Sequence, residues 1–200
     1  MSFYSANPAD DTANLTRLAQ AALIEVGEVL AGVPQALATG FVTEVQAAGR
    51  VALYGVGREG LVMRSLAMRL YHAGKQAFVV GDMAAEPIGP GDLLIVSAGP
   101  GEFATVTALM AVAHGAGART LAFSAEPGGL TSRQADVLLH LPAQTMHSDE
   151  SRHASTSSVL PMGSLYELSL WLLCDLLIEE LKRAGGISAP AMRERHTNLE

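Results

Sequence analysis

Cysteine, aromatic residues and positive charge are scarce in this chain of 200 residues. The single cysteine, Cys174, excludes a disulfide within the chain, and its apolar neighbours indicate a buried thiol in a reducing compartment. The net charge of -7 and the aromatic content of 5% are unlike those of a general nucleic-acid or membrane-surface binder, which has a basic stripe. We therefore expect neither nucleic acid nor a membrane among its partners.

Long apolar runs are scarce too. The most apolar stretch, 168–178, is interrupted by Asp175 and is too short to cross a bilayer. Residues 1–11 are polar and acidic, whereas a signal peptide has a basic start followed by an apolar stretch. We therefore expect a cytoplasmic protein. Because 49% of the residues are apolar, the chain can bury one sizeable core, which favours a single domain over 1–200.

What the sequence does contain is an alternation of helical and strand-like patterns. Apolar residues recur at helical spacing in two stretches within 1–49, and again over 61–73 and 104–116. Five short runs rich in β-branched residues lie at 51–56, 77–80, 93–97, 119–124 and 137–141. This alternation predicts an α/β fold, namely a three-layer α/β/α sandwich around a five-stranded parallel sheet of flavodoxin-like order 2-1-3-4-5, with its sheet core in 50–144.

The last quarter of the chain differs from this alternation. Residues 145–160 are polar and without periodicity, which predicts a mobile loop, and we place no metal on the histidines and carboxylates of that loop. Residues 161–184 contain a helix that is apolar nearly all round, followed by a tail over 185–200. Such a helix is either central or covered by another subunit, so we expect a homo-oligomer, a dimer or tetramer.

Two glycine-rich turns follow the first and third predicted strands. Backbone N–H groups and the positive end of the next helix would face a ligand at each turn, which is a geometry that suits an anion. In a sheet of order 2-1-3-4-5 these two turns flank the crevice where the connections diverge, so they should meet at one ligand. The candidate binding residues are Gly57, Arg58 and Glu59 in the first turn and Ser97, Gly99, Gly101 and Glu102 in and after the second.

Two alternatives exist for these turns. They could be unrelated structural turns. The first turn also matches the dinucleotide pattern G-x-G-x-x-G through Gly55, Gly57 and Gly60, with Asp82 placed as a ribose-binding acid, as in an NAD(P)-binding oxidoreductase. That pattern is common after strands, and it gives the second turn no role.

Beyond the turns, the chain resembles the sugar isomerase (SIS) domain family, and within it the 6-phospho-3-hexuloisomerases. The resemblance covers nearly all of the chain and is carried by the segments 55–58 (Gly-Val-Gly-Arg), 66–74, 91–95, 160–167 (Leu-Pro-Met-Gly-Ser-Leu-Tyr-Glu) and 195–200 (Arg-His-Thr-Asn-Leu-Glu). It implies an isomerase of sugar phosphates that needs no cofactor and acts as an oligomer with sites near subunit boundaries.

An isomerisation through an enediol needs a base for the carbon-bound proton, a donor for the oxygen and an anchor for the phosphate. The resemblance implies that Glu167 is the base. Its place in the run Ser-Leu-Tyr-Glu equally fits a capping box, in which Glu167 bonds back to the start of its own helix. His72 and His196 are the candidates for proton transfer at the sugar oxygen. The alternative for His72 is a structural histidine, and the alternative for His196 is a place in a frayed terminus.

The two turns depart from the family pattern, which has three hydroxyl side chains where this chain has Glu59, Pro100 and Phe103. Pro100 also lacks a backbone N–H. Glu59 could turn outward to Arg58 or Arg64, or the ligand could be something other than a phosphate dianion. The leading hypothesis is an isomerase of a sugar or sugar phosphate, and the second is a non-catalytic sugar sensor or partner-binding module.

Overall fold

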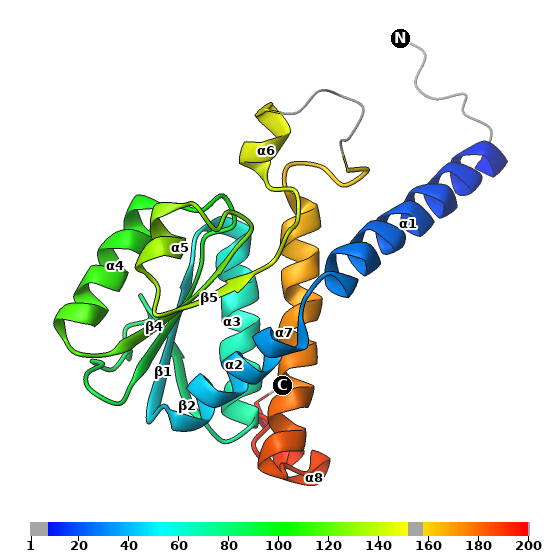
Figure 1. Cartoon of the computed structure of the whole chain (residues 1–200). Helices are drawn as coiled ribbons and strands as arrows, with labels where there is room; N and C mark the ends of the chain where they lie inside the picture. Colours follow the sequence, from blue (N-terminus) through cyan, green and yellow to red (C-terminus); the bar gives the residue numbers. More distant parts are fainter. Residues whose placement is uncertain (1–7, 152–157, 200) are drawn as a thin grey trace.

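A five-stranded parallel sheet forms the centre of the computed structural model, which describes residues 8–151 and 158–199. Its strands are β1 (Arg50–Gly55), β2 (Gln76–Val79), β3 (Leu93–Ser97), β4 (Arg119–Ser124) and β5 (Val137–His140). Their order is β2-β1-β3-β4-β5, so the predicted fold and strand order are confirmed (Figure 1). Every residue of β3 is buried, because this central strand is covered on both faces.

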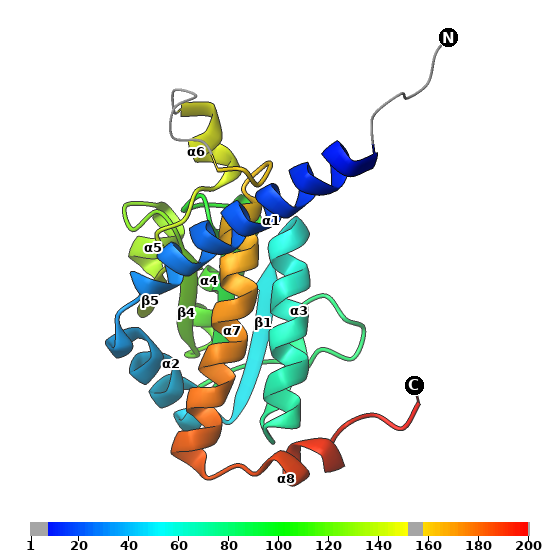
Figure 2. The ribbon, with the colours of Figure 1, turned by 90° about the vertical axis from the view of Figure 1, so that its right-hand side faces the viewer.

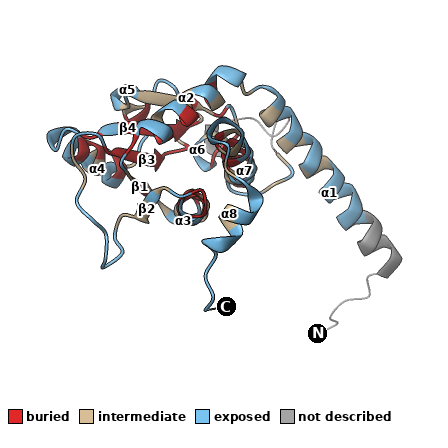
Figure 3. Ribbon diagram, turned by 90° about the horizontal axis from the view of Figure 1, so that it is seen from below, coloured by how far each residue is buried: buried red, intermediate tan, exposed pale blue. Residues whose placement is uncertain are grey.

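Helices cover both faces of the sheet. Six of them are α1 (Pro8–Ala31), α2 (Gln35–Ala47), α3 (Gly57–His72), α4 (Ala104–Gly115), α5 (Leu130–Gln134) and α7 (Ser164–Gly185). One buried cluster joins α2, α3 and α7 to the sheet, and a second joins α4 to the other face. Figure 3 shows the buried residues in the strands and on the inner sides of α3 and α7. Cys174 belongs to the larger cluster, where burial raises the pKa of its thiol.

Helix α1 leans away from the sheet and contacts the body along α7 (Figure 2). Most of its larger apolar side chains are exposed, including those of Leu15, Leu23 and Ile24. None of the described helices is by itself long and apolar enough to cross a membrane, although Asn14–Ala31 of α1 and α2 meet that test together as a pair bent by 73°.

Two short helices lie where the sequence predicts irregular chain. Helix α6 (Met146–Ser151) falls within the predicted loop 145–160, and α8 (Ala189–Glu194) falls within the predicted tail. A capping box starts α6, since the Ser148 N–H donates to Thr145 Oγ1 over 3.4 Å and the Thr145 N–H donates to Ser148 Oγ over 2.8 Å. This local exchange of hydrogen bonds explains a helix that apolar periodicity does not signal. Residues 152–157 of the predicted loop, His153 among them, lie outside the described residues.

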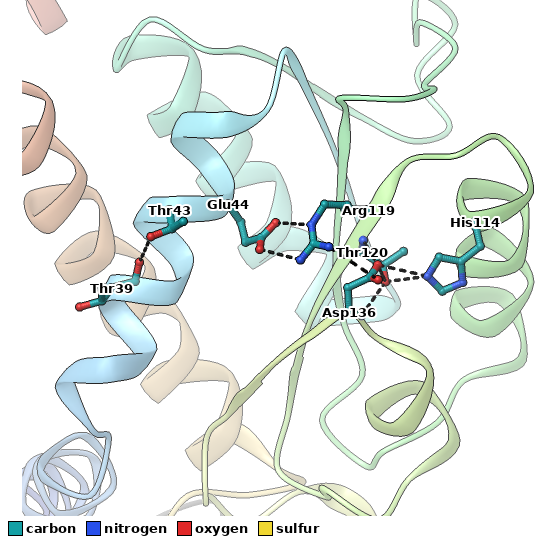
Figure 4. A network of polar contacts seen from close by, with 7 residues as sticks. All are labelled: Thr39, Thr43, Glu44, His114, Arg119, Thr120 and Asp136. Carbon is teal, nitrogen blue, oxygen red and sulfur yellow. Dashed lines mark hydrogen bonds and ion pairs between the residues drawn. The ribbon is translucent and has the colours of Figure 1, made fainter.

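A polar network fastens the amino-terminal edge of the sheet, opposite the edge that carries the two turns (Figure 4). Arg119 at the start of β4 donates two hydrogen bonds of 2.8 and 2.7 Å to Glu44 of α2. Asp136, just before β5, accepts hydrogen bonds from the Thr120 N–H and hydroxyl over 2.8 and 3.0 Å. These contacts tie α2, β4 and β5 together at this edge.

Candidate functional site

The two glycine-rich turns meet at the carboxyl edge of the sheet, as predicted. Gly55 at the end of β1 is the register partner of Ser97 at the end of β3. Above them lies a cavity of about 880 Å³. It is lined by Val56, Gly57, Arg58, Glu59, Pro100, Glu102, Phe103, Thr145, Met146, His147, Met162, Gly163, Tyr166 and Glu167.

The glycines of the first turn have structural explanations. Gly57 begins α3 with a φ of 57°, a left-handed conformation that favours glycine. A Cβ on Gly60 would lie 2.6 Å from the Gly55 carbonyl oxygen, and one on Gly55 would lie 2.9 Å from the Gly60 nitrogen. The pair therefore lets helix and strand approach closely, which accounts for the G-x-G-x-x-G pattern without a dinucleotide. Asp82, the candidate ribose ligand, pairs with Arg64 over 3.0 Å.

Glu59 points inward, from the first turn of α3 into the second glycine-rich turn. Its Oε2 accepts a hydrogen bond from the Gly99 N–H over 3.0 Å and another from the Ser97 hydroxyl. The residue is only 7% exposed. Of the two alternatives left open by the sequence, the outward orientation of Glu59 toward Arg58 or Arg64 is therefore wrong, because Gly99 and Ser97 supply the donors that a buried carboxylate needs.

Burial raises the pKa of Glu59 to about 7, against the opposing effect of the hydrogen bonds from Ser97 and Gly99. The negative charge of Glu167 raises this pKa further. Glu59 thus changes its charge near neutral pH. Two carboxyl groups that influence each other across one cavity can exchange protons with a ligand bound between them.

Tyr166 extends this buried polar chain. Its hydroxyl lies 3.2 Å from Ser97 Oγ, and since the Ser97 proton is directed to Glu59, the tyrosine is the donor. A Cβ on Gly99 would come within 2.8 Å of the Tyr166 ring, so glycine is required for this contact. Burial, and secondly the charge of Glu59, raise the pKa of Tyr166, which keeps its hydroxyl protonated.

Glu167 faces the cavity from the first turn of α7 and is paired with Arg58. Arg58 Nε lies 2.8 Å from Glu167 Oε2, and Arg58 also donates to Ser164 Oγ over 3.2 Å. Oε2 is buried and accepts no hydrogen bond of ordinary geometry from the described residues, so its contact with Arg58 is an ion pair. Burial raises the pKa of Glu167, although the charge of Arg58 lowers it in part.

The alternative of a capping box at Glu167 is wrong. Helix α7 is capped by Gly163, whose φ of 76° is left-handed, and no side chain caps this end. In a capping box the Glu167 carboxylate would accept a hydrogen bond from the Ser164 N–H. That N–H instead donates to the Pro161 carbonyl over 2.9 Å. Glu167 therefore remains available to a ligand in the cavity.

The structure brings some of the predicted site residues together and separates others. Glu102 lines the cavity, whereas Gly101 lies behind it, packed so tightly on Gly129 that a Cβ on Gly129 would be 2.4 Å from the Gly101 Cα. His72 lies at the far end of α3 from the cavity, a helix of 16 residues that spans roughly 20 Å. His196 stacks on His72 with ring centroids 5.1 Å apart.

Several cavity residues were missed from the sequence. Tyr166 directly precedes Glu167 in the sequence, and this position beside a candidate catalytic residue is the one sequence signal for it. Thr145, Met146 and His147 belong to the segment predicted as a mobile loop, and they line the cavity from the start of α6 and the residue before it. In the described parts of the chain, no three His, Cys, Asp or Glu side chains gather closely enough to hold a metal ion.

These features define an α/β domain with a small-molecule cavity at the point where the sheet connections diverge. The family model of the SIS domain matches residues 44–172, which include both turns, the sheet and the start of α7. The chain belongs to the SIS domain family.

Named relatives agree with this assignment. A protein of Bacillus subtilis called 3-hexulose-6-phosphate isomerase is 35% identical over 146 residues, which are 73% of this chain and 77% of the relative. Among solved structures, a Methanococcus jannaschii protein described as having an inferred function of 3-hexulose-6-phosphate isomerase has a TM-score of 0.76 at 24% identity, over 94% of this chain and 99% of its own. The sugar isomerase domain of the RpiR transcription factor from Sphaerobacter thermophilus has a TM-score of 0.68 at 18% identity, over 90% of this chain and 96% of its own.

Proposed function

We propose that this protein is an isomerase that moves a carbonyl group between adjacent carbons of a sugar or sugar phosphate through an enediol. The observation that carries the proposal is the carboxylate of Glu167, which faces the cavity and whose Oε2 has, among the described residues, the ion pair with Arg58 as its one polar contact. The relatives that share this family and are called 3-hexulose-6-phosphate isomerases support the same class of reaction.

In the proposed reaction, Glu167 takes the proton from the carbon next to the carbonyl group. The electrons of that C–H bond form the carbon–carbon double bond of the enediol, and the carbonyl oxygen gains a proton or negative charge. Arg58 stands beside Glu167 and can stabilise that oxygen. Glu167 then returns the proton to the former carbonyl carbon, while the hydroxyl of the carbon that was first deprotonated loses its proton and becomes the new carbonyl group.

The pKa of Glu167 suits this role. A carboxyl group with a raised pKa is a stronger base than an ordinary one, because the charged form is held in a partly buried site. His72 and His196 lie at the end of α3 that is remote from the cavity of their own chain. They therefore cannot assist proton transfer at a sugar oxygen in that cavity. They would act only in the cavity of a neighbouring copy.

Deuterium uptake tests the proposal. The protein is incubated in deuterated water with a panel of free ketoses and ketose 6-phosphates, and NMR follows deuterium at the carbons beside the carbonyl group. We expect uptake and isomer formation with the wild type, and a loss of at least about a hundredfold in Glu167→Gln. Glu179→Gln, an exposed change on the same helix, is the matched control. Absence of both uptake and isomer across the panel would reject the isomerase.

The second candidate is a non-catalytic sugar sensor. Its support is the fold shared with the RpiR transcription factor domain, together with the Glu59 carboxylate that occupies the turn at Gly99. In that case sugar binding occurs without deuterium uptake, and Glu167→Gln leaves the affinity unchanged.

We also propose that the protein forms a homo-oligomer. Helix α7 exposes a stripe of apolar side chains at helical spacing, Leu168, Trp171, Leu172 and Leu176. The largest of these side chains, Trp171, is 44% exposed. A second copy of the chain would cover this stripe and the adjacent apolar side chains of α1, which removes apolar surface from water.

A further inference from the structure

The position that an anion would take at the two turns is filled by a side chain of the protein itself. Both the Gly99 N–H and the Ser97 hydroxyl, the donors of the second turn, are directed to one oxygen of Glu59. We call this group of three residues, Ser97, Gly99 and Glu59, the cradle. Pro100 adds no N–H donor to it.

We propose that the cavity takes a neutral, unphosphorylated sugar, and that Glu59 excludes a phosphate group from the cradle. The proposal rests on the proposed function only in taking the ligand to be a sugar. It concerns which sugars bind and is independent of whether they are converted.

The charges around the cavity favour a neutral ligand. Three carboxyl groups line it, those of Glu59, Glu102 and Glu167. Among the described residues that line the cavity, Arg58 is the one arginine, and no lysine is present there. Its guanidinium is already paired with Glu167. A phosphate about 5 Å from an ionised Glu59 would lose on the order of a hundredfold in affinity for each of its charges.

A rearrangement that frees the cradle has little support in the surrounding contacts. Glu59 is held on one side by the Gly99 N–H and the Ser97 hydroxyl, with the Tyr166 ring packed beside Gly99. The cation five residues further along α3, Arg64, is engaged with Asp82 over 3.0 Å. Moving the Glu59 carboxylate would therefore break its hydrogen bonds without bringing it to an unpaired cation.

A neutral sugar can use the same carboxylate. Since Ser97 and Gly99 occupy Oε2, the other oxygen of Glu59 can accept a hydrogen bond from a sugar hydroxyl. Such a hydrogen bond has a charged acceptor and is stronger than one between neutral groups. Glu59 would then act as a specificity-determining residue that favours a sugar hydroxyl group over a phosphate group at the cradle.

The test compares two probes in calorimetric titrations of the full chain at about pH 8, D-fructose and D-fructose 6-phosphate. The quantity measured is the ratio of the two dissociation constants within one variant, so that general damage to the fold cancels. We expect wild type to bind fructose at least about tenfold more tightly than fructose 6-phosphate. In Glu59→Gln the dissociation constant of fructose 6-phosphate divided by that of fructose should fall by tenfold or more, because the charge is lost while the shape is kept.

Two further variants sharpen the comparison. Glu59→Ser opens the cradle and should gain measurable binding of inorganic phosphate, which wild type should lack. Glu102→Gln removes a charge from the exposed part of the cavity lining and should change the ratio much less. Tighter binding of fructose 6-phosphate than of fructose by wild type, an unchanged ratio in both Glu59 variants, or binding of neither sugar by wild type would overturn the proposal. A lack of deuterium uptake with an intact binding ratio would reject only the isomerase.

Discussion

Glu59 and Gly99 stand 40 positions apart in the sequence, yet the N–H of Gly99 donates to the carboxylate of Glu59 over 3.0 Å. This contact joins the turn after β1 to the turn after β3. It also leaves a carboxyl group buried at the carboxyl edge of the sheet, where its ionisation is unfavourable.

The stability of the protein should therefore fall as Glu59 ionises. Its pKa is about 7 in the folded chain and about 4.5 in a solvated one, so the folded state keeps its proton longer and stability falls as the pH rises through this window. Between about pH 5 and about pH 8, Glu59→Gln should gain about 2 kcal/mol relative to wild type. Urea unfolding at both pH values measures this. Equal losses in both proteins would contradict the buried, ionisable Glu59.

Arg58 should set the pH dependence of the proposed reaction. Its charge lowers the raised pKa of Glu167, so Arg58→Gln should move the acidic limb of the rate profile to higher pH. The rate of deuterium uptake as a function of pH shows the shift. Arg64→Gln, which breaks a pair with Asp82 outside the cavity lining, is the matched control. If both variants keep the wild-type limb, Arg58 does not act on Glu167.

Gly60→Ala tests whether the glycine pattern serves packing. The added Cβ would lie 2.6 Å from the Gly55 carbonyl oxygen, so helix and strand must move apart, at a cost of about 1–3 kcal/mol. Gly27→Ala, on an exposed part of α1 with no atom within 4 Å of its Cβ, should be neutral or stabilising. Thermal unfolding of the two variants provides the comparison. Equal stability would mean that the close approach at Gly60 is not required.

Asp136 should stabilise the amino-terminal edge of the sheet. Although burial raises the pKa of Asp136, hydrogen bonds from Thr120 and the charge of Arg119 hold it below the ordinary value. Its contribution is therefore present above the ordinary pKa of an aspartate and is lost as the pH falls through the lowered one. We expect Asp136→Asn to lower stability by about 1–2 kcal/mol at neutral pH and less in acid, measured by urea unfolding. A loss that persists undiminished in acid would point to shape instead of charge.

The apolar stripe on α7 should hold copies of the chain together. Leu172→Glu places a charge in the middle of this stripe and should yield a smaller particle in light scattering. Met83→Glu, at a fully exposed apolar side chain in the connection after β2, is the control and should leave the particle mass unchanged. A wild-type protein that is already monomeric would contradict the proposed self-association.

Much of the fold could be predicted from the sequence because its signals are local. The runs around Leu93 and Arg119 show strand composition, and the stretch 104–116 shows helical spacing, each within a short window. The predicted strand order 2-1-3-4-5 is a common one for such an alternation, and it explained why the turns after the first and third strands are both glycine-rich. The short helices α6 and α8 were not predicted because they depend on side-chain caps and not on apolar periodicity. Thr145 and Ser148 exchange hydrogen bonds at the start of α6, and the Ser188 side chain accepts a hydrogen bond from the Ala191 N–H at the start of α8.

The sequence by itself determined the α/β class of this protein, the parallel sheet and the edge at which the two glycine-rich turns meet, because periodicity and chain connectivity fix these features. Only the tertiary structure decided what the side chains at that edge do. Arg58 reaches Ser164, 106 positions away, and pairs with Glu167, while Glu59 turns inward to Gly99. Such pairings depend on distances in space and on which donors a buried carboxylate can find, and neither is written in the local pattern of residues.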